Sequence, residues 1–246
     1  GGLGLDYMGG SVRTIEEGER MSLSVMATIP HIKPDSGAGV LAILRPTATD
    51  PEIVAINERL IVHLQPKSPI SESYRTLRTN ILFTTPERPK KVLMVTSSGP
   101  KEGKSTTVAN LALTFAQMGN RTLLIDADLR KPILHDLFGL DRSIGLTNVL
   151  VGRCRLADAI SVNSELPNLG VLSCGTLPPN PAELLASANM RDLLQEVKQN
   201  YAMVLIDTPP TIAVTDASIL SALVDGVLLV IRSSVTEREA VVRAYE

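Results

Sequence analysis

The sequence predicts an α/β protein whose mainly parallel sheet is covered by helices on both faces. Its 246 residues are 44% hydrophobic but only 3% aromatic, and tryptophan is absent, so the core must be aliphatic. From residue 91 onward, apolar runs of strand length alternate with segments of helical periodicity. Near-continuous apolar strands of this kind are typical of a parallel sheet that is buried on both sides.

The first 66 residues lack this regularity, and we expect them to form an irregular, peripheral segment. A short helical stretch, TIEEGERM (residues 14–21), is followed further on by a linker-like patch, HIKPDSGAG (residues 31–39). Prolines punctuate the segment and limit the length of any element; they are Pro34, Pro46, Pro51 and Pro66. The sequence therefore divides into residues 1–66, a linker, and residues 67–246, a domain.

The regular part begins with a helix. Ser68 precedes Pro69 in the pattern of an N-cap followed by proline at the first helical position. Three apolar residues follow at helical spacing: Tyr74, Leu77 and Ile81. The next run, KVLMVTS (residues 91–97), is a predicted strand. After a glycine-rich stretch, a second helix carries an apolar face formed by Val108, Leu111, Ala112 and Phe115.

Four further apolar runs are predicted strands, and one helical zone lies among them. The strands are RTLLIDAD (residues 121–128), LGVLSCG (residues 169–175), YAMVLIDTPP (residues 201–210) and GVLLVIRSS (residues 226–234). The helical zone opens at Asn180 and Pro181, with Glu183 in the position of a capping box, and continues to Val197.

A glycine loop joins the first of these strands to the following helix. The stretch SSGPKEGKST matches G-x-x-x-x-G-K-[ST] except at the first position, where Ser98 replaces glycine. A phosphate site belongs between a strand and a helix N-terminus. Lys104 would reach the β- and γ-phosphates of a nucleotide, and Ser105 or Thr106 would offer a hydroxyl to Mg²⁺. The alternative is a tight turn with a solvated lysine.

Aspartates end two of the predicted strands. Asp126 and Asp128 lie two residues apart in LLIDADLR, on one side of an extended chain, and Asp207 ends VLID in VLIDTPP. Carboxylates at the carboxyl ends of parallel strands face the crevice where ligands bind. Oxygen ligands there suit Mg²⁺ bound to nucleotide phosphates, although one such aspartate alone is more often a helix cap or turn residue. No N-K-x-D guanine signature occurs, which favours ATP over GTP.

Composition and spacing argue against several other functions. The net charge of −2 gives the chain no electrostatic reason to bind nucleic acid. No run approaches the ~18 consecutive apolar residues that a membrane-spanning helix needs. The cysteines and histidines lack metal-ligand spacing, and two isolated thiols favour a reducing compartment. These residues are Cys154, Cys174, His31, His63 and His135.

The motifs together resemble those of the bacterial protein-tyrosine kinases, or BY-kinases, which are fused to or partnered with polysaccharide co-polymerases of capsule and exopolysaccharide export. The likeness runs from about Ser68 to the end of the chain. It includes the glycine loop, LLIDADLR, VLIDTPP, ESYRTLRTN, GTLPPNPAELL and DTPPTIAVTDA. In addition, GLDYMGGSVRTIEEGERMSLSVMATIP resembles the juxtamembrane segment that follows the second membrane span in fused members.

The resemblance implies a P-loop NTPase-type fold and an ATP-dependent tyrosine autokinase. In such a protein the γ-phosphate passes to C-terminal tyrosines of neighbouring subunits. The implied catalytic residues are Lys104, Asp126, Asp128 and Arg130. Among these, Asp126 would accept the tyrosine proton, and Arg130 would stabilise charge or position a neighbour's tail.

The same resemblance implies which residues bind the cofactors. ATP or ADP would be held by Gly99, Pro100, Lys101, Glu102, Gly103, Lys104, Ser105, Thr106 and Asp207. Mg²⁺ would be held, directly or through water, by Ser105, Asp128 and Asp207.

Glu72, Arg75 and Arg78 stand at the positions of the E-x-x-R-x-x-R helix that the family uses for ring assembly. Steps of three residues keep them within about 120° on one helix face. The alternative is a solvated stripe with an i,i+3 ion pair. The resemblance further implies a homo-oligomeric ring at the cytoplasmic face of the bacterial inner membrane. Its partners would be the polysaccharide export machinery and a protein-tyrosine phosphatase.

Two features of the sequence bear on the rival functions. Gly99 stands where Min/Par-type partition ATPases carry a signature lysine, which argues against that branch. The chain stops at VVRAYE, whereas the family ends with another strand and a tyrosine-rich tail, so we expect a truncated C-terminal end. One rival is a Min/Par-like assembly switch that hydrolyses ATP without phosphorylating tyrosine. The other is a non-catalytic regulator of polysaccharide chain length.

Overall fold

The computed structural model describes residues 11–21, 23–31, 59–84, 86–212 and 215–245. Its helices are α1 (Ile15–Arg20), α3 (Ile61–Leu64), α4 (Pro69–Thr84), α5 (Lys104–Gln117), α6 (Leu134–Phe138), α7 (Leu146–Leu150), α8 (Leu156–Ala159), α9 (Pro181–Leu185), α10 (Ala188–Asn200), α11 (Asp216–Ser221) and α12 (Arg238–Tyr245). Its strands are β1 (Val92–Ser97), β2 (Thr122–Asp126), β3 (Ile160–Val162), β4 (Leu169–Leu172), β5 (Met203–Asp207) and β6 (Gly226–Val230). Most of the expected linker patch, together with Pro34, Pro46 and Pro51, lies outside the described residues.

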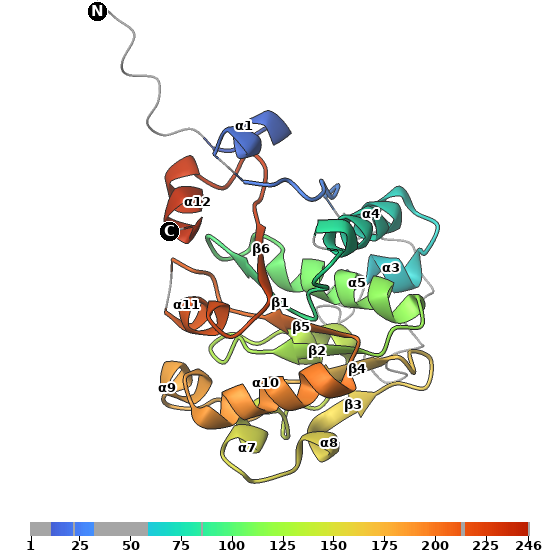
Figure 1. Cartoon of the computed structure of the whole chain (residues 1–246), viewed down its shortest axis with the longest axis vertical. Helices are drawn as coiled ribbons and strands as arrows, with labels where there is room; N and C mark the ends of the chain where they lie inside the picture. The colour runs from blue at the N-terminus through green and yellow to red at the C-terminus, as the bar shows by residue number, and fades with distance from the viewer. Residues whose placement is uncertain (1–10, 22, 32–58, 85, 213–214, 246) are drawn as a thin grey trace, which may run out of the picture.

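The strands form one sheet in the order β3-β4-β2-β5-β1-β6 (Figure 1). Neighbouring strands run parallel, except that β3 is antiparallel to β4. The four strands β1, β2, β4 and β5 are buried along their whole lengths, which explains their continuously apolar sequences. The predicted mainly parallel sheet of an α/β protein is therefore confirmed.

Helices cover both faces of this sheet (Figure 1). On one face α3, α4 and α5 pack around the buried side chains of Tyr74 and Phe115. On the other face α7, α9, α10 and α11 enclose a second apolar cluster, which includes Met190 and Leu220. Burying one large apolar side chain stabilises the folded state by about 1.5–3 kcal/mol. The two helical layers therefore hold the sheet and its strand ends in place.

The predicted start of α4 is confirmed. The Oγ atom of Ser68 accepts a hydrogen bond from the backbone N–H of Ser71 at 3.1 Å, and Pro69 is the first residue of the helix. The three apolar residues predicted for its inner face are buried: Tyr74, Leu77 and Ile81.

The helical zone after Asn180 consists of two helices, so the prediction of one continuous zone is wrong. Ser187 separates α9 from α10, because its hydroxyl accepts a hydrogen bond from the backbone N–H of Met190 and caps the second helix. The predicted capping box is also wrong. The carboxylate of Glu183 accepts a hydrogen bond from the side-chain amide of Asn180 at 2.8 Å, and no side chain caps α9.

The division of the chain at residue 66 remains a prediction, but residues on its N-terminal side pack against the domain. Leu60 and Val62 are buried in the same core as α5. The backbone N–H of Val62 donates to Oδ1 of Asn110 at 3.0 Å. Further upstream, the N–H of Val12 donates to the carbonyl of Thr236 at 2.9 Å, so α1 lies close to α12 (Figure 1).

Both cysteines are free thiols; Cys174 is buried and Cys154 is half-buried. Of the helices in the described ranges, none combines the length and apolarity needed to cross a membrane.

Candidate functional site

The predicted site residues meet at the carboxyl ends of the central strands. Asp126 stands opposite Asp207 in the register of β2 and β5. On the other side of β5 lies β1, which continues into the glycine loop. In open α/β sheets ligands bind in the crevice beyond these strand ends. The fold therefore brings together the loop and the three aspartates that the sequence singled out.

The glycine loop has a left-handed backbone at two positions. Gly103 has a φ of 88° and Lys101 a φ of 62°. Gly103 is the N-cap of α5, and no side chain caps that helix. The first N–H groups of a helix lack intrahelical partners and lie at the positive end of its dipole, so they favour a bound anion. Glycine is required at 103 because other residues adopt this backbone only under strain.

Lys104, the first residue of α5, points at the aspartates and not into solvent. Its side chain is 8% exposed. Its Nζ atom donates to Oδ1 of Asp207 at 2.6 Å and to Oγ of Ser105 at 3.0 Å. Oδ2 of Asp128 lies 3.8 Å from the same nitrogen. This geometry excludes the alternative of a tight turn with a solvated lysine.

Asp207 is fully buried, and its Oδ2 atom has no hydrogen-bond partner among the residues that the structure describes. Burial raises the pKa of this carboxyl, and the nearby ammonium of Lys104 offsets only part of the effect. A buried polar atom without a partner requires an explanation, and a bound cation or water is a common one. With Asp126 and Asp128 close by, acidic groups outnumber the one ammonium, so the cluster suits an added positive charge.

The donor set fits a hard cation that shares its coordination with a ligand. In the described ranges, no three His, Cys, Asp or Glu side chains gather into a metal cluster of their own. Mg²⁺ is usually held by one or two carboxylates, with water and phosphate oxygens completing its shell. Asp128, Asp207 and the hydroxyl of Ser105, all close to Lys104, match this requirement.

Asp126 is also fully buried, with both carboxylate oxygens engaged by the backbone. Oδ1 accepts from the N–H of Asp128 at 3.2 Å, and Oδ2 accepts from the N–H of Leu134 at 3.1 Å. Burial first, and then the charge of Asp207, raises the pKa of Asp126 well above its usual range. Asp126 is therefore a stronger base than an exposed aspartate.

Arg130 touches this cluster through its backbone N–H, which donates to Oδ1 of Asp128 at 3.3 Å, but its guanidinium bonds elsewhere. Its Nε and Nη2 atoms donate to the two carboxylate oxygens of Asp216 at 3.0 and 3.1 Å. Asp216 is fully buried at the first position of α11. This paired contact joins the segment after β2 to α11. The sequence reading missed Asp216, whose only signal was its place in DTPPTIAVTDA.

Ser98 stands where the strict loop motif has glycine, and it bonds across the loop to Glu102. It is buried, and its Oγ donates to the two carboxylate oxygens of Glu102 at 3.0 and 3.1 Å. The hydroxyl of Ser97 donates to the carbonyl of Gly99 at 2.7 Å. A glycine at 98 would lack the hydroxyl that holds Glu102, so the departure has a structural reason.

The charged stripe on α4 is bonded within the chain. Arg75 donates to Glu72 at 2.5 Å and also to the carbonyl of Pro66. Arg78 donates to the carbonyl of Thr114 at 2.8 Å and so ties α4 to α5. The subunit interface therefore remains a prediction beside the solvated-stripe alternative.

If these residues form an interface, replacing Glu72, Arg75 and Arg78 together by alanine should lower the assembly mass measured by light scattering at fixed concentration. The free energy of unfolding should change by only about 1 kcal/mol for the exposed pair and a similar amount for the Arg78 bond. The matched control replaces Arg155 and Asp158, another exposed i,i+3 pair, and should leave the mass unchanged. An unchanged mass in the triple variant would favour the solvated stripe.

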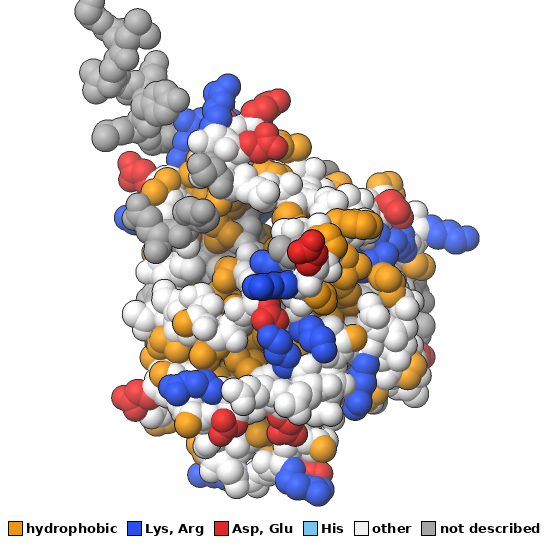
Figure 2. All heavy atoms as spheres, in the orientation of Figure 1, with side chains coloured by type: hydrophobic (Ala, Val, Ile, Leu, Met, Phe, Trp, Pro, Cys, Tyr) orange, Lys and Arg blue, Asp and Glu red, His pale blue; other side chains and the backbone are white. Residues whose placement is uncertain are grey.

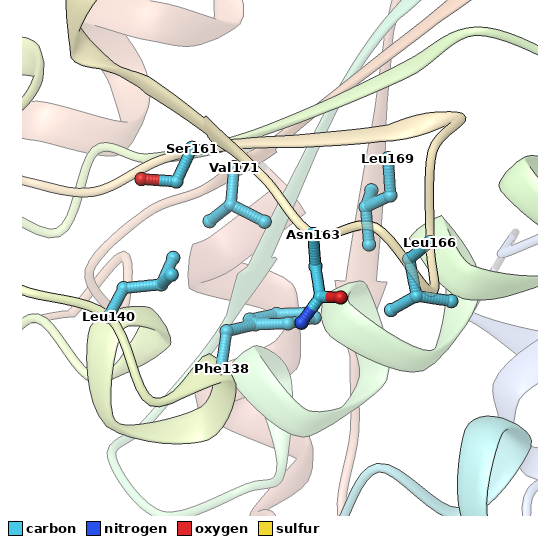
Figure 3. Close-up of a pocket in the computed structure, with 7 residues that line it drawn as sticks. All are labelled: Phe138, Leu140, Ser161, Asn163, Leu166, Leu169 and Val171. Atoms are coloured by element: carbon cyan, nitrogen blue, oxygen red, sulfur yellow. The ribbon is translucent and has the colours of Figure 1, made fainter. Parts of the chain in front are cut away.

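A separate hollow, which no residue of the glycine loop lines, lies between α6 and the β3–β4 pair (Figure 3). It is lined by Phe138, Leu140, Ser161, Asn163, Leu166, Leu169 and Val171. Five of these seven side chains are apolar and none is acidic or basic, so the hollow lacks the groups that phosphate or proton chemistry needs.

The face shown in Figure 2 carries charges of both signs. Lys and Arg side chains gather near its middle, with Asp and Glu side chains beside them and apolar side chains between. The expectation that nucleic acid is not a partner remains a prediction.

Comparison with known proteins places these observations in a family. A family model described as an AAA domain matches residues 90–241. The tyrosine-protein kinase YwqD of Bacillus subtilis is 49% identical over 191 residues, which cover 78% of this chain and 80% of YwqD. The putative tyrosine-protein kinase EpsB of Ralstonia nicotianae is 37% identical, over 87% of this chain but 27% of EpsB. The solved kinase domain of the Escherichia coli tyrosine kinase ETK superposes with a TM-score of 0.84 at 32% identity, covering 96% of this chain and 88% of that one.

Proposed function

This chain belongs to the family of bacterial tyrosine-protein kinases, and on that premise we propose that it transfers the γ-phosphoryl group of ATP to tyrosine. The observation that carries the proposal is the buried ammonium of Lys104 at the head of the glycine loop, 2.6 Å from Asp207. Phosphoryl transfer depends on positioning and charge neutralisation more than on covalent help from the protein. The ammonium of Lys104 would neutralise charge on the phosphates, and the backbone N–H groups at the start of α5 would position them.

The glycine loop would hold the phosphates of ATP or ADP. The backbone N–H groups of residue 99, of residues 101–103 and of the first turn of α5 would bind the phosphate oxygens. Lys104 would add positive charge at the β- and γ-phosphates, and Thr106 lies in the same first turn. These groups are fixed by the fold before the nucleotide arrives, which reduces the cost of ordering them.

Ser105, Asp128 and Asp207 would hold Mg²⁺, directly or through water. The free Oδ2 atom of Asp207 is the feature that best fits this role. The bound cation would neutralise charge on the phosphates during transfer.

In the transfer itself, the tyrosine oxygen bonds to the γ-phosphorus, and the bond from this phosphorus to the β–γ bridging oxygen breaks, so that ADP leaves. Asp126 would take the tyrosine proton. Its raised pKa suits that role, because a base works best when its pKa lies near the working pH. Asp126 is fully buried and accepts hydrogen bonds from Asp128 and Leu134, so an incoming tyrosine would have to displace part of the segment after β2.

The acceptor tyrosine would come from another chain. Tyr74 is buried between α4 and α5, and burial raises the pKa of its hydroxyl to about 12. Tyr201 precedes β5, at the end of the sheet opposite Asp207, and its ring stacks against Arg121 at 4.8 Å. Of the tyrosines whose side chains the structure describes, these two do not reach the cluster, which supports phosphorylation between neighbouring subunits.

The cellular setting follows from the family as a proposal. The chain would act in a homo-oligomeric ring at the cytoplasmic face of the bacterial inner membrane, and it would regulate the synthesis and export of capsular polysaccharide or exopolysaccharide. A protein-tyrosine phosphatase would reverse the modification. The small share of EpsB that the chain matches supports a kinase part within a larger system.

Binding of MgADP should weaken as the pH falls. Burial raises the pKa of Asp207, so this carboxyl takes up a proton at a higher pH than an exposed aspartate does. A protonated carboxyl is a poor cation ligand, and therefore acidification competes with Mg²⁺. Calorimetric titrations with MgADP between neutral and mildly acidic pH should show this loss. The loss should be smaller for ADP with a chelator present, and an equal loss in both series would contradict the assignment.

The direct test of the proposed function is incubation of the purified chain with MgATP and a tyrosine-rich peptide, followed by mass spectrometry of the peptide. Phosphate on tyrosine, abolished by a chelator, is the expected result. A peptide with phenylalanine in place of tyrosine is the control. ATP hydrolysis without peptide phosphorylation would favour the assembly switch, and absence of nucleotide binding would favour the non-catalytic regulator.

A further inference from the structure

The carboxylate of Glu102 is held from two sides by hydroxyl groups. Ser98 donates to it from within the glycine loop at 3.0 Å. Thr236 donates to the same Oε1 atom at 2.7 Å from a distant part of the chain, between β6 and α12. Thr236 is 3% exposed, so water competes little for this bond. The loop is therefore fastened to the segment that follows β6.

The hydroxyl of Thr236 has a fixed direction. It accepts a hydrogen bond from the backbone N–H of Arg232 at 2.9 Å, and its one proton goes to Glu102. The backbone of Thr236 is fixed as well, because its N–H donates to the carbonyl of Arg232 and its carbonyl accepts from Val12, both at 2.9 Å. The guanidinium of Arg232 donates to the carbonyl of Lys101 at 3.3 Å, a second contact with the loop.

The loop needs such support because Lys101 has a φ of 62° without being glycine. This conformation costs about 1–2 kcal/mol for an L-residue. Strained backbone of this kind persists only where the surroundings determine it by several contacts. Here the contacts are the bonds to Glu102 on one side of Lys101 and the bond from Arg232 to its carbonyl.

We propose that Thr236 is a positioning residue for the phosphate site, acting through Glu102 to hold the backbone N–H groups of residue 99 and residues 101–103 in their phosphate-binding conformation. Without the hydroxyl of Thr236, the carboxylate of Glu102 keeps, within the described part of the chain, only the bond from Ser98, and the strained turn at Lys101 relaxes. The proposal rests on the proposed nucleotide site. The strict loop motif gives no sign of it, since Thr236 lies outside every motif in the sequence.

The alternative is that Thr236 only stabilises the turn that starts at Arg232. In that case its replacement affects residues 232–236 and not the glycine loop. Thr236→Val keeps the side-chain shape and removes the hydroxyl, whereas Thr236→Ser keeps the hydroxyl. The matched control is Thr122→Val, which removes another fully buried hydroxyl, one that donates to the carbonyl of Asn120 at the opposite end of the sheet.

The first measurement is hydrogen exchange of the nucleotide-free chain. In Thr236→Val, peptides covering residues 98–103 should exchange about tenfold faster, as expected for loss of one hydrogen bond to a charged group. In Thr236→Ser and Thr122→Val these peptides should exchange as in the wild type. Faster exchange confined to residues 232–236 would overturn the proposal in favour of the structural role.

The second measurement is the dissociation constant for MgADP. Thr236→Val should bind about tenfold more weakly, while Thr236→Ser should bind like the wild type. Equal affinities in Thr236→Val and Thr122→Val would overturn the proposal. If Thr236→Val does not fold, Ser98→Ala removes the other donor to Glu102 and should speed exchange in the same peptides, and unchanged exchange there would also overturn it. If the wild type binds no MgADP, the nucleotide site itself fails, while the exchange experiment still decides the role of Thr236.

Discussion

Replacing Lys104 by methionine should abolish detectable phosphoryl transfer. The ammonium is buried among Asp207, Asp128 and the first turn of α5, so no other cation of the loop replaces its charge at the phosphates. Losing one charge-stabilising donor from a preorganised site costs about 10²–10³-fold in rate. Transfer from MgATP to a tyrosine peptide, measured at saturating nucleotide, is the readout.

The same substitution should also lower the free energy of unfolding, because Asp207 then loses its buried partner. Burial raises the pKa of Asp207, so this carboxyl is neutral at low pH and its need for a partner disappears there. The destabilisation should therefore be largest near neutral pH and shrink on acidification. The control is Lys198→Met, which removes a partly exposed lysine paired with Asp225 and should leave transfer unchanged. Equal transfer in the wild type and Lys104→Met would end the nucleotide-site interpretation.

Replacing Asp126 by asparagine should slow tyrosine phosphorylation by about 10²–10⁴-fold, the usual cost of losing one proton acceptor. In the wild type the rate should fall as the pH drops through the raised pKa of Asp126, because the base becomes protonated. The variant should lose this acid limb, since asparagine does not titrate. A pH–rate profile under saturating MgATP separates a lost base from a misfolded site.

Asp128→Asn is the matched comparison, because this carboxylate lies 3.8 Å from Lys104 and would serve the cation. It should raise the Mg²⁺ concentration needed for half-maximal transfer while keeping the acid limb. An Asp126→Asn variant with wild-type rate and wild-type pH profile would remove Asp126 from the chemistry.

Much of the fold could be predicted from the sequence because its strands are buried on both faces and therefore continuously apolar. The helix after Ser68 was also predictable, since capping and apolar spacing agree there. The antiparallel strand β3 was not, because Ile160–Val162 is only three residues long and partly exposed. The break at Ser187 was also missed, because apolar residues at helical spacing continue into α10 after the break.

In the candidate site, too, some features could be predicted from the sequence and others could not. Short motifs identified Lys104, Asp126, Asp128 and Asp207, because each lies at the end of a predicted strand or the start of a predicted helix. Contacts between distant segments leave no local pattern. The pairing of Arg130 with Asp216 and the bond from Thr236 to Glu102 join residues 86 and 134 positions apart, so they became visible only in the structure.

The most direct test of the central claim is to follow the γ-phosphate of labelled ATP in the presence of Mg²⁺ and a tyrosine-rich acceptor. The label should appear on tyrosine in the wild type, should not be detected there in Lys104→Met, and should appear about 10²–10⁴-fold more slowly in Asp126→Asn. A wild type that releases the label to water as inorganic phosphate, with none on tyrosine, would contradict the kinase and support a nucleotide-driven assembly switch.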